Sequence, residues 1–217
     1  MRLVCQYIDS MPADLSAEQF CRLITAYIRF VYDQFDTDMH LLEEIPTERM
    51  AASAVIYSAL RKEIWMVGDC QCMVDGVLYE NPKPYEAPIA DMRSGYIRLA
   101  LLNGATTADF QQKDDGRKFI LPVLIENCKN QNKTFAVIDG FAIPMPHVKI
   151  IHVEQAKEII LASDGYPVLK KSLAESEKAL ARLIVTDPLC IHDFRATKGV
   201  MQGNNSFDDR TYIRFIV

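Results

Sequence analysis

An Asp75-Gly76 pair between two short apolar runs restricts the fold of this chain more than any other feature. The type I′ turn of a two-residue hairpin needs positive φ at both central residues, and Asp-Gly is one of the few pairs that accept it. The pair therefore predicts a hairpin over residues 72–79. Two further apolar runs, residues 54–57 and 64–67, are separated by a polar turn and predict a second hairpin. We expect one meander of strands over roughly residues 53–80.

Helical and strand patterns follow one another along the rest of the chain. Ser16 and Gln19 form a capping box, and apolar residues then recur at helical spacing as far as Phe35, which predicts a long amphipathic helix. Tight turns between the strands favour antiparallel pairing, so the expected fold class is α+β. Further helices are expected over residues 95–103, over residues 117–130, and from Ser172 to before Pro188. Because of Pro122, the second of these is expected to start near Leu121. Further strands are expected over residues 134–138, 148–153, 158–162 and 212–217, and a loop over residues 81–88.

Composition limits the classes of function. With 217 residues, 49% of them hydrophobic, the chain is large enough for one domain over residues 1–217. The net charge of −5, without any basic run, argues against nucleic acid as a partner. No run approaches the roughly 18 apolar residues of a membrane span, so we expect no membrane association and a cytoplasmic location. The six cysteines lie in apolar segments and are expected to be reduced thiols.

Three aspartates stand where strands end or are interrupted. Asp164 follows the run Ile159–Ala162 and precedes a glycine, and Asp208 directly precedes the last expected strand. Asp69 follows Gly68 inside an otherwise apolar stretch, where a carboxylate is costly unless it is hydrogen-bonded or bound to a metal. Carboxylates at strand ends are suitable ligands for hard divalent cations. Aspartate also favours turns for conformational reasons alone, so each of the three has a purely structural interpretation as well.

Two cations, Arg195 and Lys198, precede the acidic pair Asp208-Asp209. They could bind a substrate phosphate, or they could balance the acidic pair in a loop, which is the more common role of such charges.

The three aspartate segments together resemble the metal-dependent serine/threonine protein phosphatases of type 2C, also called PPM. The motifs that carry the resemblance occur in the family's order over roughly residues 50–217: Val67-Gly68-Asp69 with the Asp75-Gly76 hairpin, Leu161-Ala162-Ser163-Asp164-Gly165, and Asp208-Asp209-Arg210-Thr211. The resemblance implies an α-β-β-α sandwich of two mainly antiparallel sheets flanked by helices, with Mn²⁺ or Mg²⁺ in a two-metal centre. It makes Asp164 and Asp208 metal ligands, and Asp69 a ligand of a third, weaker cation.

The chain departs from the family at its start. The family's early strand, with an Asp-Gly whose aspartate bridges both metals, precedes the first long helix, whereas here only Met1–Pro12 precede it and Asp9 lacks the glycine. The resemblance is therefore to an N-terminally shortened form. Two hypotheses follow. The chain is either a metal-dependent phosphatase acting on a phosphoprotein or a small phosphomonoester, or a catalytically impaired or truncated relative acting as a binding or regulatory module. Open sheet edges would favour a homo-oligomer.

Overall fold

The structure, a computed structural model, describes residues 2–217. It divides into two compact units, which are described separately. Unit 1 contains the residues up to Lys83 together with 128–163 and 214–217, and unit 2 contains residues 84–127 and 164–213. The expectation of one domain over residues 1–217 stays a prediction.

Within residues 2–217, seven strands form two sheets, and the pairs β1–β2, β2–β5, β3–β4 and β3–β6 are antiparallel. This confirms the predicted α+β class with two antiparallel sheets. The edge strands are β1 and β5 in one sheet and β4 and β7 in the other; self-association through these edges stays a prediction. The three-stranded sheet has the order β1 (Ala54–Ser58), β2 (Glu63–Val67), β5 (Lys149–His152), and the four-stranded sheet the order β4 (Val77–Glu80), β3 (Gln71–Val74), β6 (Glu158–Ala162), β7 (Tyr212–Ile216).

The two predicted hairpins are present, but they do not form one meander. The β3–β4 hairpin turns at Asp75 and Gly76, both with positive φ, as the pair predicts. However, β2 pairs with β5 and β3 pairs with β6, so the two hairpins belong to different sheets. Gly68 separates them with a φ of +87°, a conformation that interrupts a strand. The expectation of a continuous meander over residues 53–80 is therefore wrong.

The sheets of unit 1 face each other across an apolar layer. Ile64 and Met66 of β2 and Ile159 and Leu161 of β6 belong to one buried cluster. Because side chains alternate along a strand, Trp65 and Val67 point to the opposite face of β2, where they join a second cluster with helix α2. Unit 1 thus contains a helical layer and two sheet layers.

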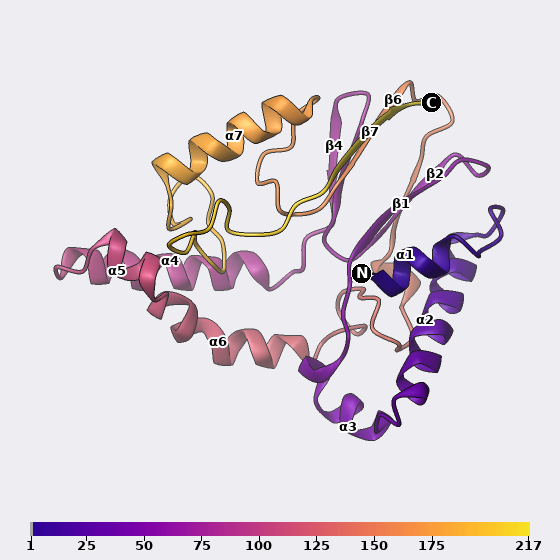
Figure 1. Ribbon diagram of the computed structural model, residues 1–217, viewed down its shortest axis with the longest axis horizontal. Coiled ribbons are helices and arrows are strands. Elements are labelled where there is room, and N and C mark those ends of the chain that lie inside the picture. The colour runs from indigo at the N-terminus through magenta and orange to yellow at the C-terminus, as the bar shows by residue number, and fades with distance from the viewer. Residues whose placement is uncertain (1) are drawn as a thin grey trace. The chain divides into compact units, whose positions relative to one another are not determined.

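The helices of unit 1 are α1 (Arg2–Ile8), α2 (Ala17–Gln34), α3 (Met39–Glu44) and two short 3₁₀ helices, Pro46–Glu48 and Met145–His147. Helix α2 begins at the predicted capping box, where the Ser16 side chain accepts from the amide of Gln19. Figure 1 shows α1 and α2 in indigo beside the β1–β2 hairpin. The strand expected over residues 134–138 is absent, and only isolated bridges such as Ala52 with Ile138 occur there.

The helices that contribute to unit 2 are α4 (Glu86–Leu102), α5 (Thr107–Gln112), α6 (Asp115–Cys128) and α7 (Leu173–Thr186). Helix α4 starts well before the expected residue 95, because Pro88 lies in its first turn, where a missing amide proton costs nothing. Helix α6 starts at Asp115 and includes Pro122 rather than beginning next to it.

Two expectations from composition can be compared with the structure. Among residues 2–217, none of the helices combines the length and apolar character needed to cross a bilayer. All six cysteines are free thiols; four are buried, Cys128 is half-buried and Cys5 is exposed. Burial raises the pKa of the Cys72 thiol to about 12, which keeps it protonated at neutral pH.

Candidate functional site

Asp69 lies in the bend between β2 and β3 of unit 1, and both of its carboxylate oxygens have partners. Lys83 Nζ forms an ion pair with Oδ2, and the Ser53 hydroxyl donates to Oδ1. The Asp69 side chain is 8% exposed and that of Lys83 is 20% exposed, so the pair is largely shielded from water. Neither Lys83 nor Ser53 is marked as a partner of Asp69 by any pattern in the sequence.

The pKa of Asp69 reflects these contacts. Burial alone would raise it, but the Lys83 charge, the Lys83 hydrogen bond and the Ser53 hydroxyl together outweigh burial and lower the pKa below its ordinary value. Asp69 is therefore an ionised carboxylate that the fold itself neutralises.

Asp164 and Asp208 both belong to unit 2, and the structure brings their segments together. Asp164 lies in the turn after β6, and Asp208 lies in the loop before β7. A Cβ on Gly165 would be 2.2 Å from the backbone carbonyl oxygen of Asp209. The turn after Asp164 therefore packs directly on the Asp208–Arg210 segment, and only a residue without a side chain permits this approach.

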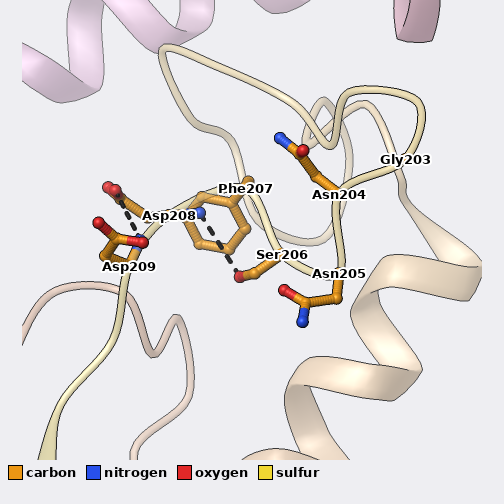
Figure 2. A pocket seen from close by; sticks show the side chains of 7 residues that line it. All are labelled: Gly203, Asn204, Asn205, Ser206, Phe207, Asp208 and Asp209. Atoms are coloured by element: carbon orange, nitrogen blue, oxygen red, sulfur yellow. Dashed lines mark hydrogen bonds between the residues drawn. The ribbon is translucent and has the colours of Figure 1, made fainter.

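The Asp208 carboxylate has one partner within its own loop and one from a preceding segment of the chain. Its Oδ1 accepts from the amide of Asp209 at 3.0 Å, and its own amide donates to the Ser206 hydroxyl at 3.5 Å; both bonds are drawn in Figure 2. Lys198 Nζ lies 2.7 Å from its Oδ2. This contact is the charge balance predicted for Lys198. The other cation of the prediction, Arg195, pairs instead with Asp91 of α4, with its Nη1 2.7 Å from Oδ1. Figure 2 shows Asp208 and Asp209 together at one end of the loop and Asn204 at the other.

Two pockets of unit 2 include Asp208. One, of about 460 Å³, is formed entirely by the loop that Figure 2 shows. The second, of about 450 Å³, also includes side chains from α7 and from the turn after β6. Its lining is mostly polar and carries more acidic than basic side chains: Tyr166, Leu173, Glu177, Asn205, Asp208, Asp209, Arg210 and Tyr212.

The second pocket contains a hydrogen-bonded group that links the two Asp segments to α7. Glu177 accepts from the Tyr166 hydroxyl at 2.6 Å and from Arg210 Nε and Nη2 at 2.8 and 2.9 Å. The hydrogen bonds from Arg210, and then that from Tyr166, lower the pKa of Glu177 to about 2. Burial and the bond to Glu177 raise the pKa of Tyr166 to about 12. The group therefore keeps fixed protonation states at neutral pH.

A fully buried arginine holds the loop that carries Lys198. Arg93 of α4 pairs with Asp114, with Nη2 2.6 Å from Oδ2, and its Nη1 donates to the carbonyl oxygens of Leu189 and Ala196 at 2.8 and 3.1 Å. Arg117 donates to the carbonyl oxygen of Thr197 at 3.0 Å. These bonds fix the backbone immediately before Lys198. The Lys198 side chain therefore reaches Asp208 from a fixed backbone.

The residues present do not fit a two-metal centre. Among residues 2–217, no three His, Cys, Asp or Glu side chains come together in a group that could hold a metal ion. Asp69 is neutralised by Lys83, and Asp208 has Lys198 as a counter-ion. A hard cation needs about six oxygen ligands, and two carboxylates, Asp164 and Asp208, do not supply that number.

The comparisons with known proteins give little guidance. No family model matches the chain. No curated protein matches it. Among the solved structures that resemble it are two of a bacterial serine phosphatase, one of them bearing a mutation. Each is 15% identical, covers 99% of this chain and 78% of its own, and has a TM-score of 0.40. A likeness this distant assigns no activity to this chain.

Proposed function

We propose that this chain is a type 2C-like phosphatase that hydrolyses phosphomonoesters, among them phosphoserine or phosphothreonine of a phosphoprotein. The observation that supports the proposal is the close packing of Gly165 on the Asp209 carbonyl, which joins two segments far apart in the sequence. Each of these segments carries a carboxylate that the family resemblance identifies as a metal ligand. Asp164 and Asp208 are accordingly the proposed ligands of one water-rich Mn²⁺ or Mg²⁺ ion, whose role would be to supply activated water.

The test is Mn²⁺-dependent turnover of p-nitrophenyl phosphate by the 217-residue chain. We expect Asp164→Ala and Asp208→Ala each to abolish the metal-dependent rate, because a single ion with two protein carboxylates cannot lose one of them. Asp14→Ala is the matched control, since Asp14 is exposed and lies in unit 1. Equal rates in the wild type and both site variants would refute the proposal.

The second candidate function is a binding or regulatory module without catalysis, and one contact motivates it. Lys198 already neutralises one Asp208 oxygen at 2.7 Å, as it would in a catalytically impaired domain that serves as a binding or regulatory module. Such a module would bind a phosphopeptide without hydrolysing it. Calorimetry with a phosphoserine peptide, run beside the turnover assay, separates the two functions: binding without any metal-dependent turnover supports the module, and turnover supports the enzyme.

A further inference from the structure

Both carboxylate oxygens of Asp69 have a partner, Lys83 Nζ at Oδ2 and the Ser53 hydroxyl at Oδ1. The Asp69–Lys83 pair lies in unit 1, and its interpretation does not depend on the proposed phosphatase activity. The family resemblance makes Asp69 a ligand of a weak third cation, whereas here an ammonium group already binds Oδ2. The question is whether this ammonium is an incidental surface partner or a built part of the fold.

The backbone on the lysine side is fixed. Lys83 lies between Pro82 and Pro84, and proline sets its own φ and biases the preceding residue to extended conformations. Asn81 donates through Nδ2 to the carbonyl oxygen of Gly68 at 2.9 Å, which binds this segment to the bend that carries Asp69. The Lys83 side chain therefore starts from a backbone that is tied to the carboxylate it contacts.

The backbone on the aspartate side is fixed as well. Gly68 has a φ of +87°, and a Cβ there would be 2.2 Å from Ser53 Oγ. This close approach places the Ser53 hydroxyl where it donates to Asp69 Oδ1. Each carboxylate oxygen thus has a donor of its own, and the side chain is only 8% exposed.

Both oxygens of the Asp69 carboxylate are already occupied by donors, Oδ2 by the Lys83 ammonium and Oδ1 by the Ser53 hydroxyl. A hard cation would instead need oxygen ligands on nearly all sides. The pair is electrically neutral, and a divalent ion would have to displace a shielded lysine.

We infer that Lys83 is the resident cation of Asp69, so that this carboxylate is one half of a buried ion-pair lock between the β2–β3 bend and the residue 81–83 loop and not a metal ligand. The lock goes beyond the proposed function, because it removes Asp69 from the carboxylates that could bind a divalent cation.

The experiment compares wild type with Lys83→Met, Asp69→Asn, the double variant, and Lys133→Met as an exposed-lysine control from unit 1. Thermal unfolding is measured without metal, and Mn²⁺ binding is measured by calorimetry. We expect Lys83→Met to lower Tm by roughly 10 °C, because it leaves an unpaired buried carboxylate. Adding Asp69→Asn to that variant should restore most of the loss, and Lys133→Met should leave Tm unchanged.

The metal measurement decides the inference even if Lys83→Met does not fold. Asp69→Asn in the otherwise wild-type chain should leave the number and affinity of Mn²⁺ sites as they are. Loss of a Mn²⁺ site in Asp69→Asn, or additive Tm changes in the double variant, would overturn the lock. Neither measurement depends on turnover. An inactive wild type would therefore refute the phosphatase proposal, and the ion pair between Asp69 and Lys83 could still be tested.

Discussion

The carboxylates of Asp69 and Asp208 both contact a lysine, but unit 1 and unit 2 hold them in different ways. The Asp69–Lys83 pair is shielded, with side chains 8% and 20% exposed, and both carboxylate oxygens have donors. The Asp208–Lys198 pair has side chains 32% and 36% exposed, so water and salt screen it. A shielded pair is costly to break, whereas an exposed one contributes about 0–1 kcal/mol. From this comparison we expect that a cation added to the protein competes more readily at Asp208 than at Asp69.

What fixes the Asp208 region is the surrounding scaffold more than its own ion pair. Arg93 is fully buried, and it is bound to Asp114 and to two backbone carbonyls of the loop before Lys198. Glu177 joins Arg210 to Tyr166, on either side of the contact between the two Asp segments. If this interpretation is correct, substitutions in the scaffold of unit 2 should have larger effects than removal of Lys198.

The largest effect is expected for Arg93→Met. It leaves Asp114 without its arginine partner and removes the donor to two carbonyl oxygens, which should cost about 3–5 kcal/mol of the free energy of unfolding. Urea denaturation measures the loss. Arg98→Met, on the exposed side of the same helix, should change stability by less than about 0.5 kcal/mol. A small effect of Arg93→Met would show that the loop is held by other contacts.

Gly165→Ala should have an intermediate effect. The added Cβ would meet the carbonyl oxygen of Asp209 at 2.2 Å, so the backbone must move, at a cost of about 1–3 kcal/mol. Because the two Asp segments separate, Mn²⁺ binding by calorimetry should weaken as well. Gly95→Ala is the control: it lies inside α4 with no atom within 4 Å of the new Cβ, and should stabilise by about 0.5–1 kcal/mol. Unchanged Mn²⁺ affinity in Gly165→Ala would separate metal binding from this contact.

Lys198→Met should have the smallest effect on stability, about 0–1 kcal/mol, because the ion pair is exposed. Without Lys198, Mn²⁺ no longer competes with an ammonium group for the Asp208 carboxylate, so its affinity should rise by at most about 5-fold. Calorimetry at low salt measures the change, with Lys178→Met as an exposed-lysine control on α7. Weaker Mn²⁺ binding in Lys198→Met would contradict the idea that Lys198 and the cation compete for Asp208.

The sequence was sufficient for features that depend on local conformation. The Asp75-Gly76 turn and the capping box at Ser16 are set by the φ and hydrogen-bonding preferences of a few neighbouring residues, and both are as predicted. Of the two cations expected to balance Asp208-Asp209, Lys198 contacts Asp208 as predicted, whereas Arg195 pairs with Asp91, which lies far away in the sequence.

Features that depend on distant contacts were not predicted. The assignment of the two hairpins to different sheets depends on the pairing of β2 with β5 and of β3 with β6, which no local pattern encodes. Lys83 lies in a proline-rich segment whose sequence predicts only a loop. Its pairing with Asp69 depends on the contact between Asn81 and Gly68, which only the structure shows. The proximity of Gly165 to Asp209 likewise needs coordinates.

The way the chain alternates between its two units has a practical consequence. The polypeptide crosses from one unit to the other four times, and β7 itself begins in unit 2 and ends in unit 1. No single cut in the gene can therefore yield either unit alone. Fragments obtained by proteolysis or by separate expression should fold only when they are mixed. A split version of the protein would have to keep the segments of each unit together.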